Sequence, residues 1–189
     1  LPADIAGSDL AGGLGRFYLL AVVSDQAQHS EIANLSLPVA QNAWVIEALP
    51  EVIGWHRDHL VPLGAELTAD ARCSFVHADF FARVHDGIEP GDDGPRRFDA
   101  ILVDIDHTPN WHLAESHAGF YSPDGLRRLV DQLHPGGAFS LWSDDPPDVD
   151  FLDLLRSEFA TAEAKVVTFP NFYTGGESAS TVYVATTEL

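Results

Sequence analysis

Acidic residues follow three short apolar runs of the sequence, at places where a carboxylate is well positioned to bind a ligand. Glu47 ends the run AWVIE, Asp79 comes two residues after SFVH, and Asp104 ends FDAILVD. Such runs are typical of buried parallel strands, and open α/β sheets bind ligands at the carboxyl ends of their strands. We therefore predict that the three acids face one crevice.

Glu47 and Asp79 suit the binding of a nucleoside. A carboxylate in the position of Glu47 can accept hydrogen bonds from both hydroxyls of a ribose. Asp79 can accept one from an adenine amino group, with Phe80 or Phe81 packed nearby. The structural alternatives are a solvated acid for Glu47 and a helix N-cap for Asp79. The ligand interpretation is stronger for the pair than for either residue, because one ligand requires both.

The loop after Asp104 and the loop after the next predicted strand hold further candidates. Asp104 and Asp106 lie close together, and paired carboxylates can raise one pKa and support general-base chemistry. His107 follows directly, and Trp111 either covers a substrate or anchors this loop. Asp144 and Asp145 would make the same crevice anionic, unless residues 144–147, Asp-Asp-Pro-Pro, form only a solvated turn.

Histidines in this region do not indicate a metal site. His107, His112 and His117 recur every five residues, which places them on no single helical face, and no compact metal motif is present. We therefore expect no bound metal.

Strands and helices alternate along most of the chain. We predict strands at 43–47, 73–77, 98–104 and 138–142, and helices at 50–60, 79–84, 124–133 and 148–159. This alternation predicts an α/β fold, with a mostly parallel sheet and helices on both faces. Two last strands, at 164–169 and 181–185, predict a C-terminal antiparallel hairpin.

Residues 1–37 fit this pattern less well. We predict that they form an N-terminal β/helical appendage to a main domain at 38–189, and that residues 16–23 are either a strand or the start of a buried helix. The sequence GGLG at 12–15 resembles a dinucleotide-binding loop. No convincing strand precedes it, however, and a lone glycine cluster is a weak signal.

Composition limits the partners and the location. The formal net charge is −19, which disfavours nucleic acid and favours a cationic substrate, although the acidity also has a plain role in solubility. No apolar run is long enough to cross a bilayer, so we expect no membrane partner. Residues 1–7 lack the features of a signal peptide, and the single cysteine, Cys73, excludes an internal disulfide. We therefore expect a cytoplasmic protein.

Five blocks of the sequence occur in the order found in the spermidine synthase family, within residues 28–186. They are VIEALPEV at 45–52, HADFF at 77–81, FDAILVD at 98–104, FY at 120–121 and LHPGG at 133–137. The first three also occur across class I S-adenosylmethionine methyltransferases, and the FY block is more particular to spermidine synthases. The chain thus resembles this family, which implies a Rossmann-like class I methyltransferase fold.

The resemblance also implies roles for individual residues. Glu47 would bind the cofactor ribose, Asp79 and Ala78 the adenine, and Asp104 would adjoin the cofactor and act as the base that takes a proton from the attacking amine. The acceptor site would then be lined by Asp106, His107, Trp111, Asp144 and Asp145.

Two of the chain's departures from the family concern the acceptor site and the cofactor loop. DIDHT at 104–108 stands where the family has Asp-Ser-Ser-Asp-Pro, so that His107 replaces the second acid. The family also has a strand, a glycine-rich loop and a helix before the strand that ends in Glu47, whereas here only Gln41 and Asn42 follow Ala40 before that strand. The first departure bears on specificity for polyamines, and the second affects the loop that would bind the cofactor.

We expect a transferase that moves an aminopropyl or other alkyl group from S-adenosylmethionine or decarboxylated S-adenosylmethionine to a small-molecule amine. A homodimer is one option for its assembly. Two alternatives stay open: a small-molecule S-adenosylmethionine-dependent methyltransferase, and a non-catalytic relative that uses the fold for binding.

Overall fold

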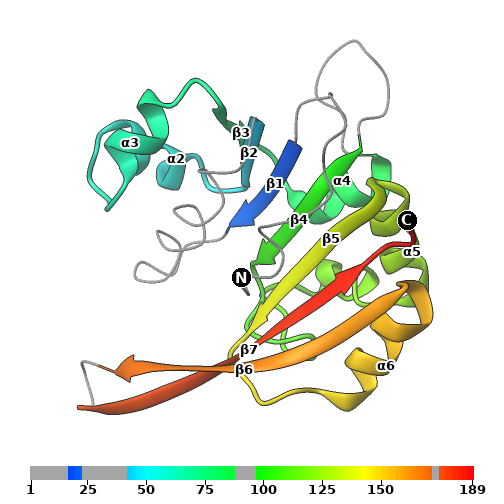
Figure 1. The fold of residues 1–189 in the computed structure, drawn as a ribbon. Helices are drawn as coiled ribbons and strands as arrows, with labels where there is room; N and C mark the ends of the chain where they lie inside the picture. The colour runs from blue at the N-terminus through cyan, green and yellow to red at the C-terminus, as the bar shows by residue number, and fades with distance from the viewer. Residues whose placement is uncertain (1–16, 23–41, 88–96, 172–174) are drawn as a thin grey trace.

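A mixed β-sheet forms the centre of the molecule (Figure 1). The computed structural model describes residues 17–22, 42–87, 97–171 and 175–189. The strands lie in the order β3-β2-β1-β4-β5-β7-β6. Their bounds are β1 Phe17–Val22, β2 Asn42–Glu47, β3 Cys73–His77, β4 Phe98–Asp104, β5 Leu133–Ser143, β6 Thr161–Asn171 and β7 Gly176–Thr186. Strands β1 to β5 are parallel, and β7 pairs antiparallel with both β5 and β6, which confirms the predicted parallel sheet with a C-terminal hairpin.

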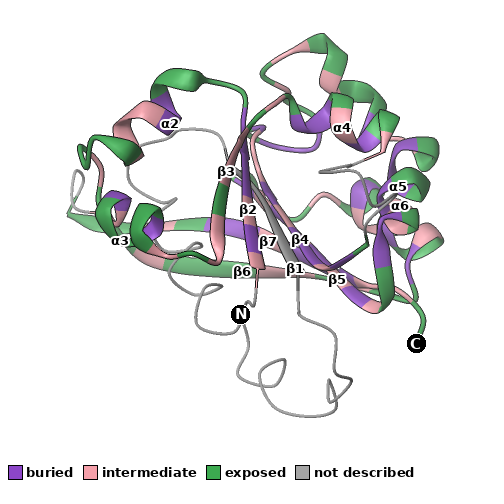
Figure 2. Cartoon of the chain, turned by 90° about the horizontal axis from the view of Figure 1, so that it is seen from above, coloured by how far each residue is buried: buried purple, intermediate pink, exposed green. Residues whose placement is uncertain are grey.

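Helices cover both faces of this sheet (Figure 2). Helices α4, α5 and α6 lie side by side on one face, and α2 and α3 lie on the other. The bounds are α2 Pro50–Arg57, α3 Gly64–Ala69, α4 Phe80–Asp86, α5 Pro123–Asp131 and α6 Val149–Glu158, with a short 3₁₀ helix, η2 Glu115–Gly119, before α5. None of the described helices is long and apolar enough to span a bilayer.

Local sequence signals set the start of α5. Ser122 caps the helix, with its Oγ accepting a hydrogen bond from the N–H of Gly125 at 3.2 Å, and Pro123 occupies the first helical turn. Gly125 is needed because the helix packs closely against η2. A Cβ atom at this position would lie 2.3 Å from the carbonyl oxygen of Gly119.

The hydrophobic core lies between the sheet and helices α4 to α6. Phe98, Ile101 and Phe139 of the central strands have no exposed surface, and neither do Leu126 of α5 and Leu155 of α6. Burying one side chain of this size contributes about 1.5–3 kcal/mol to folding. This core therefore holds β4 and β5 in place, and with them the residues at their carboxyl ends.

The N-terminal part of the prediction needs a correction. Phe17–Val22, which the sequence assigned to an appendage at 1–37, forms β1 in the middle of the sheet, paired with β2 on one side and β4 on the other. The first strand therefore lies upstream of Ala40, and the expected division at residue 37 does not hold for this strand. The glycine cluster at 12–15 lies outside the described residues.

The other predicted elements are present, with differences at their ends. Strands β3 and β4 have the predicted bounds, and α2 ends earlier than predicted, at Arg57. Strand β5 begins at Leu133, so it includes residues 133–137, which precede the predicted strand at 138–142. The short helices α3 and η2 were not predicted, because neither has a strong apolar periodicity.

Gly125→Ala is expected to destabilise the fold by about 1–3 kcal/mol, because the new methyl group would overlap the backbone of η2. The matched control is Gly54→Ala in α2, where a Cβ would meet nothing within 4 Å and the better helix former should be neutral or stabilising. Urea denaturation of both variants tests this. Equal stability of the two variants would contradict the close packing of α5 on η2.

Candidate functional site

The carboxyl ends of β2 and β3 are joined and carry two of the predicted ligand residues. Glu47 is the register partner of His77, and the N–H of Ala78 donates to the carbonyl oxygen of Glu47 at 3.1 Å. His77 Nε2 donates to the carbonyl oxygen of Ala48 at 3.1 Å. The Glu47 side chain is buried, and its Oε1 accepts a hydrogen bond from the N–H of Leu49 at 2.7 Å. The first two bonds hold the strand end, and the bond from Leu49 holds the carboxylate of Glu47.

Asp79 caps helix α4, as the structural alternative proposed. Its Oδ1 accepts hydrogen bonds from the N–H groups of Phe81 and Ala82, at 2.9 and 3.2 Å. The residue is exposed, and both cap bonds go to the same oxygen. Capping and ligand binding are therefore compatible.

Asp104 lies farther along the same edge of the sheet. It is the last residue of β4, it is half-buried, and its register partner in β1 is Val22. Strand β1 lies between β2 and β4 in the sheet, so Asp104 and Glu47 end strands that are two positions apart. The predicted gathering of the three acids at one edge is consistent with this topology.

Asp106 is not placed to bind a substrate, contrary to the sequence prediction. Its side chain has no exposed surface. The carboxylate accepts three hydrogen bonds, from Leu113 N–H at 2.7 Å, from His117 Nδ1 at 2.8 Å and from the Tyr121 hydroxyl at 3.0 Å. Burial, followed by the nearby charge of Asp106, raises the pKa of Tyr121, so its hydroxyl keeps its proton and donates. Asp106 is therefore an internal anchor of its loop.

The three histidines that the sequence singled out have different partners. His117 donates to Asp106 and stacks on the ring of Phe81, with centroids 3.9 Å apart. His112 Nε2 donates to the carbonyl oxygen of Pro109 at 2.6 Å, and its ring stacks on Tyr121. Across the described residues, no group of three metal-ligating side chains comes together.

His107, Trp111 and Asp144 form a small exposed cluster beside the ends of β4 and β5. The N–H of Asp144 donates to the carbonyl oxygen of His107 at 2.8 Å, and His107 Nδ1 lies 3.4 Å from Asp144 Oδ2. The rings of His107 and Trp111 have centroids 4.7 Å apart. Trp111 is 65% exposed, so most of its side chain is accessible to a ligand. The structure thus brings together three of the predicted acceptor residues.

The turn after β5 is held by its backbone. Thr181 Oγ1 donates to the carbonyl oxygen of Asp145 at 2.7 Å, while the Asp145 side chain is exposed. Asp148 caps α6, its N–H donates to the Tyr183 hydroxyl at 2.7 Å, and its carboxylate accepts a hydrogen bond from Asn110. The Asn110 contact joins this turn to the loop that carries His107 and Trp111. Sequence reasoning missed it because the two residues lie 38 positions apart.

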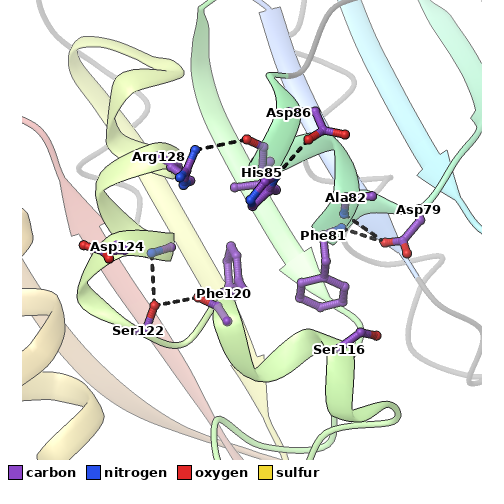
Figure 3. Close-up of a pocket in the computed structure, with 13 residues that line it drawn as sticks. Asp79, Phe81, Ala82, His85, Asp86, Ser116, Phe120, Ser122, Asp124 and Arg128 are labelled. Atoms are coloured by element: carbon purple, nitrogen blue, oxygen red, sulfur yellow. Dashed lines mark hydrogen bonds and ion pairs between the residues drawn. The ribbon is translucent and has the colours of Figure 1, made fainter.

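A cavity of about 530 Å³ lies between α4, η2 and α5 and was not predicted (Figure 3). Asp79 stands at one end of it, and Arg128, which donates to the carbonyl oxygen of His85, stands at the other. Phe81 and Phe120 lie between the two ends. The cavity therefore borders the proposed adenine residue but extends away from it along the helices. No local sequence signal could have shown it, because its walls come from separate elements.

Comparison with solved structures identifies the fold. A spermidine synthase from Thermotoga maritima has a TM-score of 0.63 at 17% identity, covering 91% of this chain and 54% of that protein. Human Methyltransferase-like protein 13, in complex with SAH, has a TM-score of 0.62 at 14% identity, covering 93% and 73%. A predicted O-methyltransferase from Agrobacterium tumefaciens has a TM-score of 0.56 at 20% identity, covering 94% and 76%.

These similarities confirm the Rossmann-like methyltransferase fold that the sequence predicted. The chain spans about half the length of the spermidine synthase. No protein-family model and no curated protein sequence matches the chain.

The capping role of Asp79 can be separated from any ligand role. Asp79→Ala should lower the free energy of unfolding by about 0.5–2 kcal/mol, because two N–H groups at the start of α4 lose their acceptor. Asp79→Ser should retain most of this stability, because serine is an equally good N-cap. Thermal or urea denaturation of both variants provides the measurement. A serine variant as unstable as the alanine variant would show that the cap is not what stabilises the helix.

Proposed function

We propose that the protein is a transferase that uses an S-adenosylmethionine-type cofactor and moves an aminopropyl or other alkyl group to a small-molecule amine. The observation that carries this proposal is the joined end of β2 and β3, where the buried Glu47 and the exposed Asp79 follow neighbouring strands. Ligands of open α/β sheets bind outside such strand ends. Human Methyltransferase-like protein 13 has a similar fold and was solved with SAH, which supports an adenosyl ligand here.

The residues at this edge fit an adenosyl group. Leu49 holds the carboxylate of Glu47 and Ala78 holds its backbone, and a carboxylate held in this way is a good acceptor for the two hydroxyls of a ribose. Asp79 uses Oδ1 for the helix cap, so Oδ2 is the oxygen we assign to the adenine amino group. Ala78, between the strand end and Asp79, has only a methyl side chain and would let a flat base approach the backbone.

Asp104 is the base in this proposal. The bound cofactor would supply a carbon on a sulfonium centre, which is open to attack by an amine. An alkyl amine is protonated at neutral pH and must lose a proton before it attacks. The carboxylate of Asp104 would first attract the cation and then accept its proton. Its place at the end of β4, which only β1 separates from β2, supports this role.

The acceptor would lie between Asp104 and the cluster of His107, Trp111 and Asp144. Asp104 and Asp144 lie at the ends of the neighbouring parallel strands β4 and β5, so the acceptor side is anionic. The exposed ring of Trp111 can bind a cation over its face. The net charge of −19 agrees with a cationic amine as the substrate and disfavours nucleic acid. The single cysteine agrees with a cytoplasmic location.

Two alternatives rest on specific observations. Methyl transfer is favoured by the human and Agrobacterium proteins, which are named as methyltransferases and share the fold. A non-catalytic binding role is favoured by the connection between β1 and β2: residues 23–41 contain no glycine, although glycine-rich loops after the first strand are common in nucleotide-binding folds of this type. Ligand binding distinguishes these roles before any assay of turnover.

Glu47→Ala and Asp79→Ser are expected to bind methylthioadenosine about ten- to a hundredfold more weakly than the wild type, since each loses a hydrogen bond that involves a charged group. Isothermal calorimetry measures this, and the serine variant keeps the helix cap. Glu51→Ala, an exposed acid in the first turn of α2, is the control and should bind normally. Wild-type affinity in both test variants would refute the adenosine assignment.

Asp104→Asn should lower the turnover of an amine acceptor by about 10²–10⁴ while methylthioadenosine binding is retained, because asparagine cannot accept the proton. The assay uses putrescine and other amines with either cofactor form. Asp131→Asn, a change of an exposed acid on α5, should alter the rate little. Near-normal turnover by Asp104→Asn would remove Asp104 from the mechanism. Methyl transfer by the wild type, with no alkylation of any amine by the decarboxylated cofactor, would replace the aminopropyl proposal with the first alternative.

A further inference from the structure

We propose that Asp106 is a positioning residue for the acceptor site, which it serves by closing residues 107–112 into a loop that holds His107 and Trp111 beside the end of β4. The identity of that site as the acceptor site rests on the proposed function. The loop closure itself rests only on the contacts of Asp106. This role differs from the one predicted from the sequence, in which Asp106 lines the acceptor site.

The loop begins and ends at the same carboxylate. Asp106 lies two residues after the end of β4, and its Oδ1 accepts a hydrogen bond from the N–H of Leu113 at 2.7 Å. Thr108 and Trp111 form two backbone hydrogen bonds across this loop, at 3.2 and 3.4 Å. His107 and Trp111 therefore lie within a short closed segment, and their positions depend on the bond that closes it.

Two side chains from the next turns complete the environment of the carboxylate. His117 Nδ1 donates to Oδ1 at 2.8 Å, and the Tyr121 hydroxyl donates to Oδ2 at 3.0 Å. A carboxylate with no exposed surface is costly unless several donors compensate for its lost hydration. Here three donors, spread over residues 113–121, do so. Neutralising the one carboxylate would weaken all three contacts.

His117 also connects this network to a rigid part of the fold. Its ring stacks on Phe81, which is buried and whose N–H is held by the cap residue Asp79. Helix α4 thus provides a fixed wall for the loop. Loosening the loop should therefore disturb the acceptor side more than the adenosine side, where Asp79 and Glu47 have their own anchors.

Asp106→Asn tests the proposal, because it keeps the size of the side chain and removes its charge. Hydrogen exchange of the ligand-free protein should increase about tenfold at the amides of residues 107–113, with no increase in β4 or α5. The KM for the amine should rise about tenfold, while the Kd for methylthioadenosine should change less than about threefold. The control is Asp131→Asn, an exposed acid on α5, which should change none of these values.

Two substitutions of His117 separate the hydrogen bond from ring packing. His117→Phe keeps a ring on Phe81 but loses the donor, whereas His117→Asn places an amide N–H near the position of Nδ1 and loses the ring. We expect the larger rise in hydrogen exchange at residues 107–113 in His117→Phe, because phenylalanine cannot donate to Asp106. A larger rise in the asparagine variant would mean that stacking on Phe81, and not the Asp106 carboxylate, holds the loop.

The results distinguish this proposal from the proposed function. Faster exchange at 107–113 in Asp106→Asn supports loop closure even if the wild type alkylates no amine, in which case only the proposed function fails. Unchanged exchange there overturns the positioning role whatever the activity, and so does an unchanged KM in an active enzyme. If Asp106→Asn does not fold, Tyr121→Phe, which removes one donor to the same carboxylate, is measured instead, with the same two outcomes.

Discussion

Parallel pairing of β1 to β5 is the constraint on which the candidate site depends. Because these strands run in one direction, all their carboxyl ends lie at one edge of the sheet. The core fixes their register: a shift of one residue would turn Ile101 or Phe139, which have no exposed surface, to the opposite face of the sheet. The same packing that stabilises the fold therefore places Glu47 and Asp104 at one edge, before any ligand is considered.

The carboxylates at this edge differ in how their charges are held, and this decides what each can do. Asp106 has no exposed surface, so a ligand cannot reach it. Its carboxylate already accepts three hydrogen bonds, and a ligand that replaced one of these donors would break a hydrogen bond inside the protein. Asp79 is exposed and bonds the backbone through one oxygen. Asp144 is exposed beside His107, so its hydration can be exchanged for contacts with a ligand. Exposure therefore separates Asp106 from Asp79 and Asp144, although the three acids look alike in sequence.

The sequence could predict the elements that carry strong local signals. Strand β4 is a continuous apolar run, and α5 has a serine cap, a proline in its first turn and an apolar face, so both were predictable. Strand β1 was not, because an apolar segment such as residues 16–23 fits a strand or a buried helix until its pairing partners are known. The role of Asp106 was also hidden: its donors come from positions 113, 117 and 121, in and around a short 3₁₀ helix that the sequence did not predict.

One half of the candidate site lies at strand ends and the other lies in a loop, so the two halves support different conclusions about function. Glu47 and Asp79 adjoin strand ends, which the fold shares with both spermidine synthases and methyltransferases. They support an adenosyl ligand but do not choose a reaction. His107 and Trp111 lie in a loop, and loops vary more than the elements that they connect. Because His107 stands where the spermidine synthase family has a second acid, the negative charge for an amine in the proposed function would come from Asp104 and Asp144, at the ends of β4 and β5. If the proposed function holds, the loop that Asp106 closes would set the choice of acceptor, and the adenosine side would serve any of the proposed reactions equally well.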